Sequence, residues 1–340
     1  MSEAGARAAP WIAAQTKVLL AQQGHAWLLH GPSGLGQYRL ALELARAWLC
    51  ESASADGACG TCPSCHAIDV HTHADLCVLM PETQMLELGW PLSEKAQSDI
   101  DDKKRKPSRE IRVDAMRDAI EFSQRTSARG RGKAVLVYPA EQMNAVTANA
   151  LLKTLEEPPG AVRFVLATES SHQLLPTIRS RCLGHAMHWP TPVVAQAWLL
   201  EQGLSADEVN GFLKAAGGRP DDVLALRAAG RKSDDWARFP AAMAAGETAF
   251  VRDWPIGELV DALQKLCHDA LCIQHNAPPR FFGLKPANPA MSHGGPGLAA
   301  LSQWAVALKN TRKTMDHPFQ AGLMQEALVE QARTALNSAH

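Results

Sequence analysis

Hydrophobic residues in the first half of the chain form short runs that alternate with segments of helical spacing. Four runs predict buried strands: residues 25–30, 76–80, 134–138 and 163–167. Three of the intervening segments place apolar side chains three and four positions apart and predict helices: residues 37–50, 113–124 and 144–157. Strands that alternate with helices predict a parallel sheet flanked by helices, which is the α/β class.

Residues 84–109 interrupt this alternation. Gly89, Pro91 and Pro107 break any regular element there, and residues 99–106 form the charged run DIDDKKRK. A run of mixed charge is typical of a mobile, solvated loop, which is the structure we expect. A basic tip that touches DNA is the alternative.

The rest of the chain shows helical spacing only. Leucine and alanine stripes predict six helices: residues 198–216, 223–231, 236–249, 255–274, 298–314 and 319–337. Five prolines predict a loop over residues 277–297: Pro278, Pro279, Pro286, Pro289 and Pro296. Stripes of this kind are typical of the core of a helical bundle.

The composition is that of a globular protein with two or three domains. The 340 residues are 46% hydrophobic and 20% charged, with a net charge of −1. A net charge near zero excludes an overall positive electrostatic potential that would attract DNA or an anionic membrane. A basic groove formed together with other subunits would not show in the net charge of this chain. No apolar run approaches 18 residues and residues 1–10 show no signal-peptide pattern, so we expect a cytoplasmic protein and no membrane.

A glycine-rich loop lies between the first predicted strand and helix. Gly31, Gly34 and Gly36 match a Walker A phosphate loop in spacing and context. The motif needs Lys and then Ser or Thr after the last glycine, to bind the phosphates and Mg²⁺, but Gln37 and Tyr38 stand there. We therefore expect no productively bound ATP. The backbone N–H groups of the loop leave weak phosphate binding open.

The strand at residues 134–138 ends where a Walker B motif would supply Asp for Mg²⁺ and Glu for the attacking water. Tyr138 and Pro139 occupy those positions. Glu141 is out of register, and we expect it to face solvent near a helix start. Both acidic groups of a nucleotide-hydrolysing site are therefore missing.

Four cysteines follow the glycine-loop helix with the spacing C-x8-C-x2-C-x2-C: Cys50, Cys59, Cys62 and Cys65. In a reducing cytoplasm, clustered thiols of this kind predict a tetrahedral zinc site with no position left for water, so its role is structural. Ordinary reduced thiols are the alternative. His66, His71 or His73 could replace one sulfur, but we expect all three at the surface.

Three further segments carry a resemblance to a known family. NALLKTLEEPP at residues 149–159, FVLAT at 164–168 and LLPTIRSRC at 174–182 closely resemble the bacterial clamp-loader ATPases of the AAA+ family. That family also contains the four-cysteine insert. The intact Ser-Arg-Cys motif beside broken Walker A and B motifs makes the chain similar to the non-catalytic subunit of the DNA polymerase III clamp loader. The resemblance covers roughly residues 10–190.

The resemblance implies an architecture and a set of partners. We expect an α/β AAA+ module with its zinc-binding insert at residues 1–188, an all-α lid at 189–231 and an all-α collar domain at 232–340. The implied partners are the motor (τ/γ) subunits and the δ subunit in a hetero-pentameric ring. Through that complex the chain would meet the sliding clamp and primed DNA, as part of the DNA-directed DNA polymerase (nucleotidyltransferase) holoenzyme.

The resemblance also implies where the chemistry lies. Arg181, between Ser180 and Cys182, takes the place of the family's arginine that reaches the ATP of the neighbouring subunit. The alternative role for Arg181 is a structural ion pair at a helix end. Arg179, two positions earlier, is the arginine most easily mistaken for the functional one. In the lid, the arginine that reads the γ-phosphate is replaced by Asp221, two residues beyond Arg219.

Two classes of function fit these residues. The first is a non-catalytic clamp-loader subunit without ATPase activity. The second is a catalytically competent AAA+ motor or helicase-loader ATPase with an unusual loop. The first is favoured because the charge partners of the triphosphate are missing at four places. A free-standing zinc-dependent DNA-binding protein is disfavoured, since no basic helix follows the cysteines.

Overall fold

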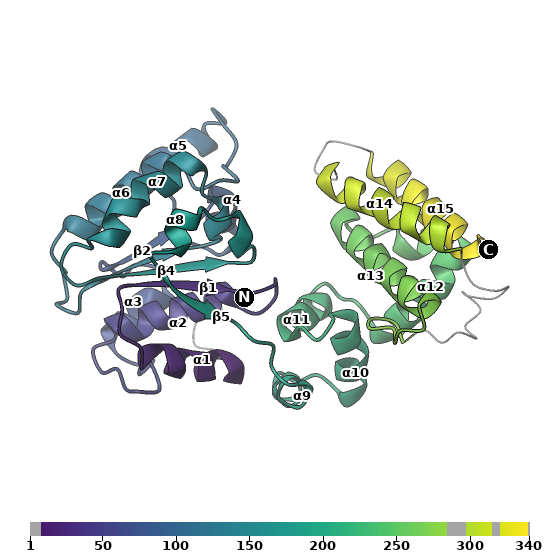
Figure 1. Ribbon diagram of the computed structural model, residues 1–340, viewed down its shortest axis with the longest axis horizontal. Helices are drawn as coiled ribbons and strands as arrows, with labels where there is room; N and C mark the ends of the chain where they lie inside the picture. Colours follow the sequence, from purple (N-terminus) through teal and green to yellow (C-terminus); the bar gives the residue numbers. More distant parts are fainter. Residues whose placement is uncertain (1–7, 284–296, 315–319, 339–340) are drawn as a thin grey trace. The chain divides into compact units, whose positions relative to one another are not determined.

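The chain folds as two compact units, Met1–Pro190 and Thr191–His340 (Figure 1). This computed structural model describes residues 8–283, 297–314 and 320–338. Residues 1–7 of the N-terminal segment, Pro286, Pro289 and Pro296 of the expected loop, and Phe319 lie outside the described residues. The finer division at residues 188 and 231 stays a prediction.

The first unit is built on a five-stranded sheet with the order β2-β3-β4-β1-β5, and every neighbouring pair is parallel. Its strands are β1 (Ala26–His30), β2 (Leu76–Leu79), β3 (Lys133–Val137), β4 (Val162–Thr168) and β5 (Leu183–Ala186). The α/β class is confirmed. The sequence pattern missed β5 because this edge strand is short and mostly exposed, so it shows no apolar run.

Helices cover both faces of the sheet (Figure 1). On one face lie α1 (Pro10–Leu20), α2 (Gln37–Leu49) and α3 (Pro63–Asp69), and on the other α6 (Val113–Gln124), α7 (Ala145–Glu156) and α8 (Pro176–Arg179). Successive side chains of β3 alternate between these layers: Ala134 packs with Ile68, whereas Val135 packs with Met116 and Leu151. Strands buried on both faces explain the continuous apolar runs of the sequence.

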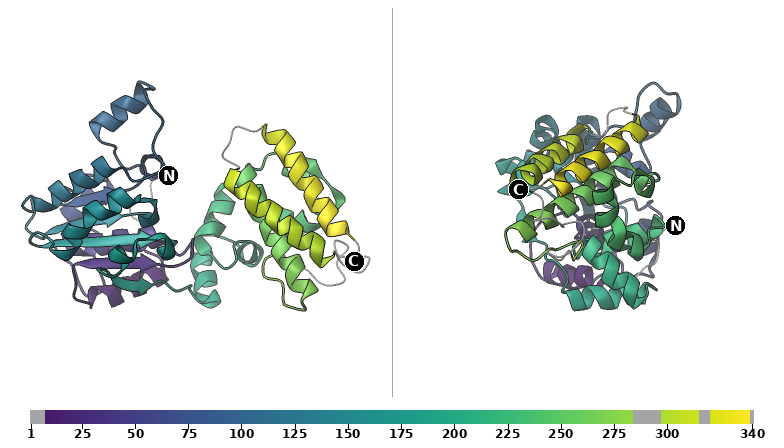
Figure 2. Two further views of the ribbon diagram at one scale, coloured as in Figure 1. Left: turned by 45° about the horizontal axis from the view of Figure 1, so that its top comes forward. Right: turned by 90° about the vertical axis from the view of Figure 1, so that its right-hand side faces the viewer.

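The segment at residues 84–109 is more ordered than a solvated loop. It contains the end of α4 (Glu82–Glu87) and all of α5 (Glu94–Asp101), which stands out from the first unit (Figure 2). The side chain of Ser93 caps α5 by accepting from the N–H of Ala96. Arg105 donates to Glu82 at 2.8 Å, so the charged run folds back onto α4. Lys104 and Arg105 have local acidic partners that the sequence pattern could not show.

The second unit is helical throughout its described residues, as predicted. Its α-helices are α9 (Pro192–Glu201), α10 (Ala206–Ala215), α11 (Pro220–Ala228), α12 (Ser233–Ala245), α13 (Ile256–Gln274), α14 (Leu298–Thr314) and α15 (Ala321–Asn337). The single helix expected at residues 198–216 is wrong: Gly203 adopts φ 81° and ends α9. Ser205 and Glu208 then form a capping box that starts α10.

A large core joins the helices of the second unit. Trp236, Phe239 and Trp254 stack within it, beside apolar side chains of α13, α14 and α15. Asp269 of α13 is fully buried and accepts the N–H groups of Arg280, Phe281 and Phe282 at 2.7–2.9 Å. Within the part of the chain that the structure describes, no helix combines the length and apolar character that a membrane span requires.

A buried carboxylate ties the start of β2 to the turn before β3. Asp75 is fully buried and accepts from the N–H groups of Ala128 at 2.8 Å and Arg129 at 2.9 Å, from Ser127 Oγ at 3.0 Å and from Lys133 Nζ at 3.4 Å. Burial raises the pKa of Asp75, but these donors outweigh burial and leave the pKa below its ordinary value. The carboxylate is therefore charged and fully hydrogen-bonded.

We expect Asp75→Asn to destabilise the first unit by about 2–4 kcal/mol, because it removes a buried charge from partners that remain buried. A lowered folded-state pKa means that the contribution is complete above the unfolded value of about 3.9 and is lost as pH falls through the folded pKa. The difference between the two proteins should therefore shrink in acid. Amide hydrogen exchange of β3, measured in both full-length proteins at several pH values, gives this stability difference.

Asp114→Asn is the matched control, since that carboxylate is 72% exposed. Equal protection of β3 in wild type and Asp75→Asn at neutral pH would contradict the prediction.

Candidate functional sites

The glycine loop has the backbone of a phosphate-binding loop, and its own side chains fill it. Gly34 and Gly36 adopt φ 82° and 81°, which favour glycine, and α2 begins directly after them. The buried side-chain amide of Gln37 turns back and donates to the carbonyls of Gly31 at 3.0 Å and Pro32 at 2.7 Å. Gln37 therefore binds the loop itself, where a Walker A lysine would bind phosphate.

An aromatic cluster joins the Walker A and Walker B positions. The rings of Tyr38 and Tyr138 lie 5.6 Å apart, one at the start of α2 and the other at the end of β3. Trp90, between α4 and α5, is buried and donates its indole N–H to the hydroxyl of Tyr38 at 2.6 Å. His71 stacks on Trp90 at 3.9 Å. Bulky rings thus occupy the two positions that would hold the magnesium ligands.

Carboxylates gather beside this cluster. Burial raises the pKa of Tyr138, and the negative charges of Glu169, Glu141 and Glu87 raise it further. Glu141 does not simply face solvent: it is half-buried, and its Oε1 accepts the N–H of Glu169 at 3.0 Å. Three carboxylates therefore lie close to Tyr138 at the carboxyl end of β3.

The four cysteines predicted to bind metal come together. The sulfur atoms of Cys50, Cys59, Cys62 and Cys65 all lie within 4.8 Å of one another, with 3.5 Å between Cys50 and Cys59 and 3.8 Å between Cys50 and Cys62. Cys50 follows α2, and Cys62 caps α3. The cluster can hold one metal ion, and the chemistry of four thiols fits a thiolate-binding metal.

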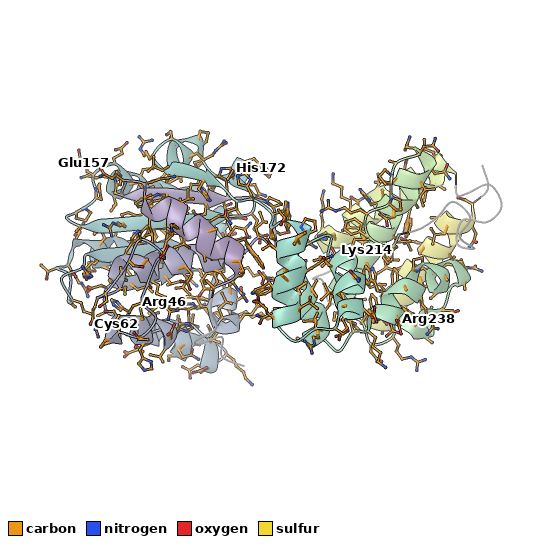
Figure 3. All side chains as sticks on the ribbon, turned by 90° about the horizontal axis from the view of Figure 1, so that it is seen from below. Arg46, Cys62, Glu157, His172, Lys214 and Arg238 are labelled. Atoms are coloured by element: carbon orange, nitrogen blue, oxygen red, sulfur yellow. The ribbon has the colours of Figure 1, made fainter. Side chains whose placement is uncertain are left out.

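Backbone groups point at these sulfurs. The N–H groups of Ser52, Cys59, Cys62 and Cys65 donate to a cysteine sulfur at 3.3–3.5 Å. Hydrogen bonds from Thr61 and from the N–H of Cys62 lower the pKa of Cys59 to about 6, whereas burial raises the pKa of Cys65 to about 12. Arg46 lies beside the module, where Figure 3 labels it with Cys62, and donates to Asp69 at 2.8 Å. The surroundings favour the thiolate form at Cys59 in particular.

The three histidines near the module differ from our expectation. His66 is exposed, as predicted, but His71 is half-buried and stacks on Trp90. His73 is buried, and its Nδ1 accepts the N–H of Asp75 at 3.1 Å. Among the described residues, no histidine belongs to the cysteine cluster.

Arg181 follows α8 and forms a local ion pair. Its Nε donates to Glu156 Oε1 at 2.6 Å and its Nη1 to the carbonyl of Thr177 at 2.8 Å. The side chain of Arg181 is 30% exposed and that of Glu156 47%. Ser180 Oγ donates to Thr177 at 3.2 Å, and Cys182 packs against the core. In the isolated chain Arg181 therefore forms an ion pair with Glu156, as the alternative role for this arginine requires.

The lid segment offers no arginine at the expected position. Gly217 and Gly218 adopt φ 63° and 87°, and Asp221 lies in the first turn of α11. Arg219 pairs with Asp222 at 2.6 Å and donates to the carbonyl of Ala216 at 3.1 Å. Its guanidinium is bound within its own helix–turn segment.

Sequence reasoning missed Trp90, which completes the aromatic cluster from an insertion 52 residues after Tyr38. The sequence shows Trp90 only as an isolated tryptophan within a polar segment. Such a residue indicates burial, but it does not indicate that Tyr38 is its partner.

Comparison with known proteins identifies the family. The family described as "DNA polymerase III, delta subunit" matches residues 13–188. The chain is 37% identical over 202 residues to the DNA polymerase III subunit delta′ of Pseudomonas aeruginosa, covering 59% of this chain and 55% of that protein. It is 32% identical over 252 residues to the Escherichia coli subunit delta′, covering 72% of this chain and 67% of that protein.

Among solved structures, a DNA polymerase III γ-subunit-related protein from Thermotoga maritima aligns over 96% of this chain and 100% of its own, with a TM-score of 0.49 at 16% identity. The matched region spans about half to two thirds of the length of the two curated relatives. The chain belongs to the bacterial DNA polymerase III δ′ family.

Proposed function

We propose that this chain is a non-catalytic clamp-loader subunit that helps ATP-dependent loading of the sliding clamp onto primed DNA. The observation that carries the proposal is a phosphate loop filled by its own side chains, in the same unit as an intact Ser-Arg-Cys motif. Gln37 binds Gly31 and Pro32, and the ring of Tyr38 lies 5.6 Å from that of Tyr138. The chain acts on the nucleotide of a neighbour and not on its own.

The competing function is a working AAA+ motor or helicase loader. Turnover there would need a lysine on the phosphates and acids that hold Mg²⁺ and orient water. Gln37 and Tyr138 supply neither charge, and Trp90 covers the hydroxyl of Tyr38. Opening this cluster would expose buried aromatic surface and break the hydrogen bonds of Gln37, with no charge gained in return. The geometry therefore supports the non-catalytic role.

Arg181 is the residue that we assign to the trans-acting role. Its guanidinium is always charged and presents forked donors that suit phosphate oxygens. Its ion pair with Glu156 is substantially exposed, and exposed pairs contribute only about 0–1 kcal/mol. Arg181 can therefore leave Glu156 and bind a highly charged triphosphate at a small cost in free energy. Ser180 and Cys182 hold the backbone on either side of the arginine.

The proposed partners are the motor (τ/γ) subunits and δ, in a hetero-pentameric ring in the cytoplasm. A net charge of −1 gives this chain no field of its own for DNA, so contact with primed DNA and the clamp comes through the assembled complex. In this role the chain contributes no intrinsic ATPase activity to the polymerase holoenzyme.

We propose structural Zn²⁺ as the metal of the four-cysteine module. A Zn–S bond of about 2.3 Å in a tetrahedron requires sulfur atoms about 3.8 Å apart. The separations of 3.5 Å and 3.8 Å from Cys50 fit that size. Four sulfurs fill every ligand position, so the metal would stabilise the module and would not activate water.

We expect the purified chain to release no phosphate from ATP above background and to bind ATP weakly at most, because the charge partners of the triphosphate are absent. A phosphate-release assay and equilibrium dialysis with Mg²⁺ measure this, with a bacterial motor subunit as the positive control. Gln37→Lys combined with Tyr38→Thr should remain inactive, since Tyr138 and Pro139 still supply no acid. Magnesium-dependent turnover that survives mutation of Gln37 would refute the proposal.

We expect about one equivalent of zinc in metal-replete protein. Cys59→Ser should remove most of it and destabilise the module by several kcal/mol, because structural zinc peptides gain about 10–16 kcal/mol from the metal. Elemental analysis and thermal unfolding measure the two effects. Cys272→Ser, outside the cluster, is the matched control. Less than half an equivalent in the wild type would contradict the zinc assignment.

We expect Arg181→Ala to fold and to enter the ring, while ATP-dependent clamp loading and turnover by the adjacent motor subunit fall. Arginine fingers contribute about 10³–10⁵ in rate elsewhere, and the loss here should be smaller because the ring has several nucleotide sites. Gel filtration of the mixed subunits checks assembly, and Arg179→Ala is the matched control. Normal loading by a fully assembled Arg181→Ala complex would leave the chain as a scaffold only.

A further inference from the structure

The glycine- and arginine-rich turn at residues 125–133 has no role in the proposed function. Two arginines of this turn reach the metal module. Arg131 donates from Nε to the carbonyl of Cys50 at 3.1 Å and from Nη2 to the carbonyl of Glu51 at 2.6 Å. One guanidinium therefore holds the backbone of a candidate metal ligand and of the residue that follows it, with one hydrogen bond to each.

Arg129 holds the same corner of the module through side chains. Its Nη1 lies 2.9 Å from Glu51 Oε1 and 3.4 Å from Ser64 Oγ. Ser64, fully buried beside Cys65, donates to the same Glu51 oxygen at 2.9 Å. Arg129 thus links the stretch that carries Cys50 to the helix that carries Cys65.

The other side of the turn is fixed to the sheet. The N–H groups of Ala128 and Arg129 bind the buried carboxylate of Asp75. Gly132 adopts φ 84°, and a Cβ atom there would lie 2.3 Å from the carbonyl oxygen of Ala161. The path of the turn is therefore determined on both sides, and so are the positions of Arg129 and Arg131.

Cys50 is the ligand that most needs such support. Cys59, Cys62 and Cys65 lie within seven residues of one another, so local turns can bring their sulfurs together. Cys50 lies nine positions before Cys59, after the end of α2, where the chain has left the helix with an extended ψ of 136°. The carbonyls that follow α2 at this point are those that Arg131 binds.

We propose that Arg131, assisted by Arg129, is a positioning residue of the metal site, which couples Cys50 to the sheet through the turn and Asp75. This inference rests on the proposed zinc. Groups that orient metal ligands from outside the coordination sphere typically change metal affinity about 10–100-fold when removed. Arg129 and Arg131 thus serve the module and not a nucleic acid.

The experiment compares the full-length wild type with Arg131→Ala, Arg131→Lys and the matched control Arg125→Ala. Arg125 lies in the same turn but pairs with Glu121 on an exposed surface. Zinc release to a coloured chelator and the labelling rate of the cysteines by a thiol reagent are both measured. We expect about 10-fold faster release from Arg131→Ala, an intermediate rate from Arg131→Lys, and the wild-type rate from Arg125→Ala.

The two readouts separate this inference from the zinc proposal. If the wild type holds no zinc, that proposal fails, while faster labelling of Cys50 in Arg131→Ala still supports the positioning role. If zinc is present and Arg131→Ala releases it and labels at the wild-type rates, the positioning role is overturned. Arg131→Lys provides the same test if Arg131→Ala does not fold.

Discussion

The burial of a parallel sheet on both faces is the constraint on which the first unit depends. Parallel strands need a crossover between each pair, so helices must cover both sides and the carboxyl ends of the strands must meet at one edge. The glycine loop after β1, Tyr138 after β3 and Thr168 at the end of β4 all reach that edge. In open sheets of this kind, ligands bind in the crevice outside this edge.

Where no ligand is bound, the protein itself must supply hydrogen-bond partners for the polar backbone groups at this edge and side chains that fill the space. Here Gln37 supplies the hydrogen-bond donors for two loop carbonyls, and the rings of Tyr38, Tyr138 and Trp90 supply the volume. In the proposed role, Gln37, Tyr38 and Tyr138 are therefore structural residues, and the segment that carries Trp90 takes part in the same cluster.

The sequence predicted what local spacing determines and missed what distant contacts determine. The four cysteines, the glycine loop and the four buried strands follow from residues close together in the chain. The break between α9 and α10 was also readable, since Ser205 and Glu208 have capping-box spacing. No local pattern could show that Trp90 meets Tyr38, that Arg131 meets Cys50, or that Asp75 is charged and buried. Those contacts join segments 50 or more residues apart.

The aromatic cluster lies in the same unit as Arg181, the residue that we propose acts on the nucleotide of the neighbouring subunit. The rings of Tyr38 and Tyr138 lie 5.6 Å apart and join the start of α2 to the end of β3. Arg181 belongs to the same unit, between α8 and β5, and β5 pairs directly with β1. In the proposed role, its position therefore does not depend on nucleotide bound to its own chain, so it offers the neighbouring site a constant cation.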